Sequence, residues 1–397
     1  MDAIKDWTQA YNELVSRVGL RFERQQSRRR LSAYLQGLLS NTDRKNSWQL
    51  AESLGETTPY GIQQFLYRAK WSADEVRDDL QRYVVEQLGE AEGVLVVDET
   101  GFLKQGDHSV GVQVQYSGTA GGTANSQVGV FLVYAGSQGH TFLDRALYLP
   151  RSWTDDRERC QAAGVPDEVE FATKPELALE MLQRVIDRGV PCRWVTGDSV
   201  YGNGMIIRGW LESLPLGYVL GVSRNDTVID RWPERVKTLL DQLPQAGWQR
   251  LSAGTGSKGE RLYDWFRRPL GGVTIVGWQR WLLVRRSLRE PTRLSPYVCF
   301  APTGTTLQSL VQVAGTRWTV EQCFQQAKQE VGLDEYEVRS WDGWHRHITL
   351  ACLAHAFLTV VRAHGLDPLA EAAPKKQLAN HPTSLADFKA RRGLISP

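Results

Sequence analysis

The chain has 397 residues, of which 42% are apolar and 23% are charged. This composition excludes disordered and collagen-like chains, and the length predicts two or three globular domains. No apolar run reaches the roughly 18 to 20 residues that cross a bilayer, since the run from Ile348 to Val361 contains His355. Because a signal-peptide pattern and paired cysteine spacings are both lacking, we expect a cytoplasmic protein with free thiols and no membrane partner.

The first ninety residues carry helical periodicity and turn residues, which predicts an all-α N-terminal domain over residues 1–90. Its third and fourth helices, separated by a turn at Gly55, have the rhythm of a helix-turn-helix. The same rhythm is common in any helix bundle, so this feature leaves DNA docking open. The helices are expected at 4–18, 28–40, 47–54, 59–70 and 72–88.

Two segments concentrate positive charge in a chain whose formal net charge is only +2. Arg17, Arg21, Arg24 and Arg28 follow helical spacing, which predicts one basic stripe. Residues 231–293 hold thirteen Lys or Arg against five Asp or Glu. Such stretches favour phosphate contact, and a solvated surface is the alternative.

From residue 93 the pattern changes to buried strands separated by Gly-rich turns, followed by alternating helices and strands, which predicts an α/β domain. A Trp- and Arg-rich, strand-like segment over 225–300 then interrupts the alternation and is interpreted as an insertion. The resulting organisation is 91–224 as the first part of the α/β domain, 225–300 as the insertion, 301–365 as the second part and 366–397 as a polar tail. Strands are expected at 93–98, 109–116, 127–134, 142–149, 192–196, 217–222 and 273–286, and helices at 175–188, after 201–204, and at 306–314, 319–331 and 345–362.

Two aspartates follow buried apolar runs. Asp98 ends the run from Val94, and Asp198 ends the run from Trp194. Open α/β sheets place ligand sites at the carboxyl ends of their strands, and a buried carboxylate needs a cation or hydrogen-bond donors. Together the two aspartates suggest a shared metal, whereas each alone is more often a helix N-cap or turn residue.

A third carboxylate is indicated by helical spacing. Around an ideal helix, Glu321 lies about 40° and Lys328 about 20° from Arg317, so the three side chains share one face. This face is either an ordinary ladder of charged pairs or the wall of a cleft, and spacing alone does not decide.

Other acidic residues and a histidine-rich segment offer alternatives. Asp107 is one substitute for a member of the acidic set; Glu99 would face away from Asp98 on a continuing strand, and Glu330 lies about 180° from Glu321. A zinc site is a weak alternative because its candidates scatter around a helix and lack paired motifs; they are His345, His347, Cys352 and His355.

These motifs together resemble a known family. The series Arg317, three residues, Glu321, six residues, Lys328 is similar to the signature of DDE transposases of bacterial insertion sequences in the family 4 superfamily. Ala314 stands where that signature opens with a tyrosine. The wider pattern resembles the insertion-sequence-701 family in the segments 98–102, 109–113, 149–153, 171–175 and 194–198.

The resemblance implies an RNase H-like catalytic domain, interrupted by a β-rich insertion, in which Asp98, Asp198 and Glu321 hold two Mg²⁺ ions, with Mn²⁺ as a substitute. It also implies that Arg317 and Lys328 bind phosphates. Trp318 is similar to an aromatic residue that relatives stack on a displaced base, and its alternative is a plain core tryptophan.

The function that follows is cut-and-paste DNA transposition by cleavage of element ends and strand transfer. We expect double-stranded DNA as partner, a homodimer on DNA and a location at the bacterial nucleoid when DNA is bound. Two alternatives remain: a non-catalytic DNA-binding protein and a metal-dependent nuclease that does not join strands. Further DNA contacts are expected from Arg21, Arg24, Arg28, Arg285 and Arg286.

Overall fold

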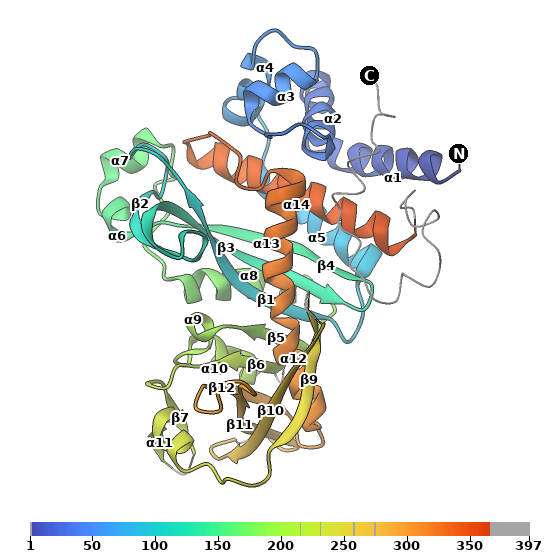
Figure 1. The fold of residues 1–397 in the computed structure, drawn as a ribbon. Coiled ribbons are helices and arrows are strands. Elements are labelled where there is room, and N and C mark those ends of the chain that lie inside the picture. Colours follow the sequence, from blue (N-terminus) through green and yellow to red (C-terminus); the bar gives the residue numbers. More distant parts are fainter. Residues whose placement is uncertain (1, 215, 231, 257–258, 274, 366–397) are drawn as a thin grey trace.

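The computed structural model describes residues 2–214, 216–230, 232–256, 259–273 and 275–365. Within these residues the architecture is mixed α/β, as predicted, and one large sheet with helices on both faces organises the fold (Figure 1). The polar tail expected over 366–397 lies outside the described residues.

The described strands of the large sheet number ten, in the order β2-β3-β1-β5-β6-β12-β11-β10-β9, and β4 lies beside β3. β1 is antiparallel to β3 and parallel to β5, which is in turn parallel to β6. This mixed sheet is consistent with the RNase H-like fold that the resemblance implies. The strands are β1 (Val94–Leu103), β2 (Gln113–Ser117), β3 (Gly122–Gly136), β4 (Gly139–Tyr148), β5 (Trp194–Gly197), β6 (Gly217–Gly221), β9 (Gln249–Gly256), β10 (Gly259–Leu270), β11 (Trp278–Arg286) and β12 (Leu294–Pro302).

β1 is longer than its apolar run predicted. It continues past Asp98 because β3 pairs with it along its whole length, from Val94 opposite Ala135 to Leu103 opposite Ser126. β5, by contrast, pairs with β1 only as far as Val97. The residues after Val97 therefore pair with β3 on one side and have no β5 partner on the other.

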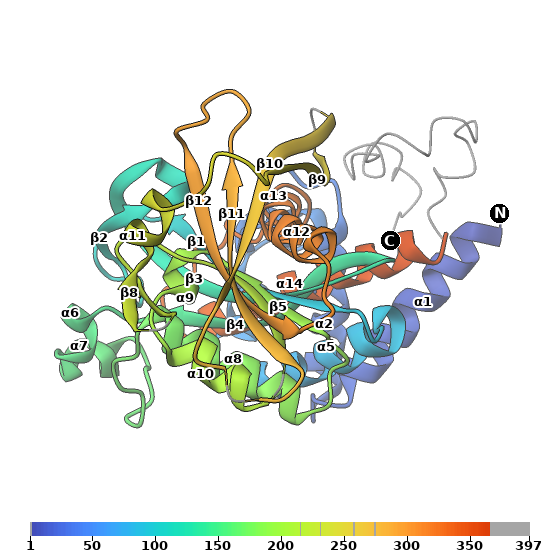
Figure 2. The same ribbon diagram turned by 90° about the horizontal axis from the view of Figure 1, so that it is seen from below.

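Helices cover the two faces of the sheet. α8, α9 and α10 pack on one face, and α12 and α13 pack on the other, as the view in Figure 2 shows. Two short helices, α6 and α7, occupy a segment for which no helix was predicted. The bounds are α6 (Arg151–Thr154), α7 (Arg157–Ala162), α8 (Lys174–Asp187), α9 (Ser199–Gly202), α10 (Ile206–Ser213), α12 (Leu307–Thr316), α13 (Trp318–Val331) and α14 (Trp341–Ala363), with a 3₁₀ turn at Gly118–Ala120.

The N-terminal helices form close to their predicted positions. Asn46 and Ser72 cap two of them by accepting hydrogen bonds from the backbone N–H groups three residues later. α5 packs against α14 and β4, so this helix joins the N-terminal region to the sheet. The bounds are α1 (Asp2–Gly19), α2 (Gln25–Leu39), α3 (Ser47–Ser53), α4 (Tyr60–Tyr67) and α5 (Ala73–Leu88).

Most of the segment 225–300 extends the central sheet. β12 pairs with β6, and β11, β10 and β9 follow in order, so these strands share a continuous hydrogen-bonded ladder with β1 and β5. Before them lie a separate two-stranded sheet of β7 (Thr227–Ile229) and β8 (Pro233–Arg235), and the short helix α11 (Val236–Asp241). This continuity places strands of the basic segment beside the α12–α13 junction.

The apolar segment near the C-terminus forms α14, which is buried along most of its length. Its histidines serve packing: His347 hydrogen-bonds Tyr34 of α2, and His355 hydrogen-bonds Thr141 of β4. Burial lowers the pKa of both imidazoles to about 3, so they are neutral at physiological pH. None of the helices in the described part of the chain has the length and apolarity that a membrane crossing requires.

Candidate active site

Asp98 and Asp198 occupy equivalent positions on two neighbouring parallel strands. Val97 of β1 is opposite Gly197 of β5, and each aspartate is the next residue in the chain, Asp98 within β1 and Asp198 directly after β5. Neighbouring strands lie about 4.8 Å apart, so this register brings the two carboxylates to the same point at the edge of the parallel pairing. The apolar runs that precede them are buried and fix this register.

Asp198 also has a local structural role. Its side chain accepts a hydrogen bond of 2.8 Å from the backbone N–H of Val200 and caps α9. α9 lies very close to β6, because a Cβ atom at Gly202 would be only 1.9 Å from the carbonyl oxygen of Gly221. Burial raises the pKa of Asp198 above its ordinary value. The N-cap interpretation of Asp198 is therefore confirmed, and the ligand interpretation stays a prediction.

Asp98 is more deeply enclosed, with 14% of its side chain exposed. One oxygen accepts a 2.9 Å hydrogen bond from the backbone N–H of Glu99. Burial raises the pKa of Asp98 to about 7, although the nearby guanidinium of Arg317 acts in the opposite direction. A carboxylate in such a position gains from any additional cation.

Glu321 is connected to Asp98 through Arg317. One terminal nitrogen of Arg317 lies 3.1 Å from Oδ2 of Asp98, and the other lies 2.9 Å from Oε1 of Glu321. Arg317 stands at the junction where α12 ends and α13 begins, and Glu321 follows one helical turn later. The structure thus brings Asp98, Asp198 and Glu321 to one region, with the guanidinium between two of them.

The donor chemistry of this region suits a hard divalent cation, because carboxylate oxygens are the ligands that Mg²⁺ prefers. As arranged, however, the described residues contain no group of three or more His, Cys, Asp or Glu side chains that could hold a metal ion. The cation that two of the three carboxylates now contact is Arg317. The residues therefore fit a divalent metal in chemistry, but in their present arrangement the three carboxylates do not form one ligand set.

Glu99 lies on the opposite face of β1 from Asp98, as strand alternation predicted. Its carboxylate pairs with Lys174 at 2.8 Å and accepts a hydrogen bond from the buried hydroxyl of Tyr201. Lys174 begins α8, and Tyr201 belongs to α9, the helix that Asp198 caps. Glu99 therefore ties α8 and α9 to β1 behind the site. Lys174 and Tyr201 were missed as site residues, although Lys174 lies within one of the motifs that carried the resemblance.

Lys328 lies farther along α13 and contacts the end of β1. Its ammonium donates hydrogen bonds of 3.2 Å to the carbonyl oxygen of Gly101 and to the hydroxyl of Thr119. Burial lowers the pKa of Lys328 from its ordinary value. Its partners are Gly101, Thr119 and, at 3.9 Å, Asp334, so Lys328 is a neighbouring cation of the site and does not bridge the three carboxylates.

Trp318 is not a core tryptophan, because 39% of it is exposed. The guanidinium carbon of Arg261, from β10, lies 5.6 Å from the centre of its ring, within cation–π range. Arg261 also donates hydrogen bonds to the carbonyl oxygens of Ala253 and Gly315, and so connects β9 to the end of α12. Sequence reasoning missed Arg261, since nothing distinguished it from the other arginines of the basic segment.

Arg285 and Arg286, both predicted to contact DNA, point to opposite faces of β11. Arg285 lies over the ring of Tyr263, at 4.6 Å from its centre. Arg286 pairs with Asp264 on the other face and lies over Trp248. Tyr263 and Arg261 share a strand face, since they are two residues apart on β10, so Arg285 is on the side that approaches Trp318.

The predicted N-terminal arginine stripe is wrong. α1 ends at Gly19 and α2 begins at Gln25, so no single helix carries all four arginines. Arg17 pairs with Glu86, and Arg21 makes two hydrogen bonds to Asp79. Glu86 and Asp79 both belong to α5. Arg24 and Arg28 remain exposed.

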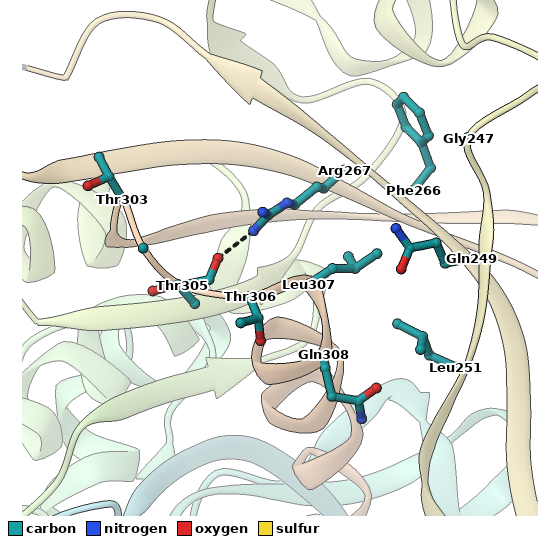
Figure 3. Close-up of a pocket in the computed structure, with 11 residues that line it drawn as sticks. Gly247, Gln249, Leu251, Phe266, Arg267, Thr303, Thr305, Thr306, Leu307 and Gln308 are labelled. Atoms are coloured by element: carbon teal, nitrogen blue, oxygen red, sulfur yellow. Dashed lines mark hydrogen bonds between the residues drawn. The ribbon is translucent and has the colours of Figure 1, made fainter.

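A separate pocket of about 560 Å³ opens at the other end of α12. Figure 3 shows Phe266, Leu251 and Gln249 around it, with Arg267 donating a hydrogen bond of 2.6 Å to the carbonyl oxygen of Thr305. The ten residues of α12 span about 15 Å, and Arg317 follows its far end. The three carboxylates do not line this pocket, so it is separate from the candidate site.

Comparison with known proteins places the chain in a family. A family model described as DDE superfamily endonuclease matches residues 18–246, more than half of the chain. The chain belongs to this family. It is also similar to the probable transposase for insertion sequence element IS701 of Microchaete diplosiphon, with 26% identity over 312 residues, or 76% of this chain and 74% of that relative. The resemblance predicted from the motifs is confirmed. The matched model region contains Asp98 and Asp198 but ends before Glu321, whose assignment depends on its link through Arg317.

Proposed function

We propose that this chain is a DNA transposase that cleaves the ends of an insertion sequence and joins them to target DNA, with Asp98, Asp198 and Glu321 as the metal-binding carboxylates. The observation that supports this most strongly is the convergence of the three acids. Two lie at equivalent positions of neighbouring parallel strands, and the third reaches Asp98 through a shared guanidinium.

Two Mg²⁺ ions at such carboxylates would activate a water or a 3′-hydroxyl and stabilise the leaving oxygen of an in-line displacement at phosphorus. The chain's own residues hold the Asp98 and Asp198 carboxylates in place. Glu99, through Tyr201 and Lys174, fixes the helices behind Asp198. Val200 holds the Asp198 carboxylate through its backbone N–H, and Glu99 holds one oxygen of Asp98 in the same way.

DNA would lie along the face that carries Arg317, Trp318 and Lys328. Trp318 is 39% exposed, and we propose that an unpaired base stacks on its indole, a contact that contributes about 1 to 3 kcal/mol. Arg285 extends the same positively charged and aromatic surface along β11. Arg21 and Arg286 are held by acids, so we assign them no leading part in DNA contact.

We assign recognition of the element ends to the helices of residues 1–90. The α3–α4 pair turns at Gly55, whose φ of +75° is one that glycine adopts readily. Trp48 and Tyr60 are exposed on these helices, and the exposed Arg24 and Arg28 supply positive charge at the start of α2. Because two ends must be joined, we propose a homodimer on DNA.

The test combines purified full-length protein, Mg²⁺ or Mn²⁺, a labelled element end and a target plasmid. Joined products are expected for a transposase, cleavage alone indicates a nuclease, and a shifted but uncut band indicates a DNA-binding protein.

The Asp98→Asn variant should lose cleavage and joining while it still shifts the labelled DNA. Asp107→Asn is the matched control, because Asp107 is a highly exposed aspartate near the end of the same strand. Full cleavage by Asp98→Asn would refute the assignment of the carboxylate site.

A further inference from the structure

The Arg317 guanidinium lies between two of the three acids of the proposed metal site, a position that the proposed chemistry does not explain. Its two terminal nitrogens serve two different carboxylates, Asp98 at 3.1 Å and Glu321 at 2.9 Å. An ordinary surface pair between Arg317 and Glu321 would need only the four-residue helical spacing. The contact with Asp98 spans 219 residues of sequence and reaches a largely buried oxygen.

A metal ion bound by Oδ2 of Asp98 and Oε1 of Glu321 would need the two oxygens that this guanidinium contacts. Mg²⁺ binds carboxylate oxygens at about 2.0 to 2.1 Å and demands a near-ideal octahedron. Two cations at such short range repel each other, and the repulsion is stronger where water is largely excluded. Arg317 and a metal bound by these two oxygens are therefore mutually exclusive partners.

The surroundings allow the side chain to move without the helices. On its far side the α12–α13 junction is fixed, because Arg261 bridges the carbonyl oxygens of Ala253 and Gly315, and a Cβ atom at Gly315 would be only 2.2 Å from the Ala253 oxygen. The Arg317 side chain is 27% exposed, so part of it already reaches solvent.

We propose that Arg317 is an internal counter-ion of Asp98 and Glu321 that divalent metal displaces, and that the released guanidinium then pairs with a phosphate of the DNA. The inference rests on the proposed metal site. It assigns Arg317 two successive partners, and it makes metal binding and DNA binding support each other, since each favours the released position of the same side chain.

The two roles of Arg317 predict opposite effects. A residue that only binds phosphate has no influence on metal affinity in the absence of DNA. A residue that occupies the metal position weakens metal binding, so removing it strengthens binding. Because hydrogen bonds to charged groups are among the stronger ones in proteins, we expect about tenfold tighter Mn²⁺ binding in Arg317→Met.

The experiment is calorimetric titration of Mn²⁺ into the full-length chain without DNA, at pH 8. Lys328→Met is the matched control, because it removes a cation from the same helix that does not contact Asp98 or Glu321. Its Mn²⁺ affinity should change by less than about twofold, because its ammonium contacts Gly101 and Thr119 and does not occupy the oxygens of either acid. Arg317→Lys retains the charge but loses the two-pronged geometry, and should fall between wild type and Arg317→Met.

Unchanged or weaker Mn²⁺ binding by Arg317→Met, or an equal gain in Lys328→Met, would overturn the proposal while leaving the metal site intact. If Arg317→Met does not fold, Arg317→Lys decides by the same criterion. Absence of Mn²⁺ binding by the wild-type chain, or unchanged binding by Asp98→Asn, would instead overturn the metal site and the inference together.

Discussion

Substitution of Asp98 by Asn should stabilise the protein in neutral and alkaline solution in the absence of divalent metal. The pKa of Asp98 rises from the ordinary value of 3.8 to about 7, mainly because burial disfavours the charged form. A rise of about three pH units corresponds to at most about 4 kcal/mol, at about 1.4 kcal/mol per unit. Asn has nearly the same shape and no charge, and its amide oxygen can still accept a hydrogen bond from Arg317.

The direction of the stability change with pH follows from the difference between the folded and unfolded pKa values of Asp98. A carboxyl group whose pKa is raised in the folded protein loses stability as pH rises from its unfolded value through its folded value. Below about pH 4, Asp98 is protonated in both states and the variant gains nothing. The gain should appear between about pH 4 and pH 7 and be complete above pH 7.

Thermal unfolding measured from pH 4 to pH 8, with a chelator present, is the assay. With an unfolding entropy of about 2.1 cal/mol/K per residue, the full gain would raise the melting temperature of a chain of this length by about 5 °C. Asp107→Asn, at a highly exposed position, should leave it unchanged. A variant that is less stable than wild type at pH 8, or equally shifted at all pH values, would refute the burial argument.

The parts of the site that could be predicted from sequence depend on local patterns. The apolar runs before Asp98 and Asp198 are buried strands, and the residue that follows each run falls at the same edge because the strands are parallel neighbours. Arg317 and Glu321 are four residues apart on what is nearly one helical path, so their proximity is also local. Such relations need only the periods of strands and helices.

The parts that could not be predicted depend on distant partners. β1 continues past Asp98 because β3, more than twenty residues later, pairs with it. The pairing of Arg21 with Asp79 depends on how α5 packs, and residue spacing within one helix does not predict a contact with another helix. The contact between Arg317 and Asp98 is likewise tertiary, so the motif indicated which residues meet but not that a guanidinium separates two of the acids.

Two further predictions test the surroundings of the site. Arg285→Ala should weaken binding of labelled DNA, and the loss of affinity relative to wild type should be about tenfold larger at low than at high salt, because a phosphate contact releases counterions. Arg286→Ala, on the opposite face of β11, should change DNA affinity little. Equal losses in both variants would contradict the assignment of one strand face to DNA. Gly202→Ala should abolish DNA cleavage. The added Cβ atom would lie 1.9 Å from the carbonyl oxygen of Gly221, so α9 must move away from β6, and Asp198, which caps α9, must move with it. The variant should retain DNA binding in a gel-shift assay, and normal cleavage would show that the spacing between α9 and β6 does not set the position of this carboxylate.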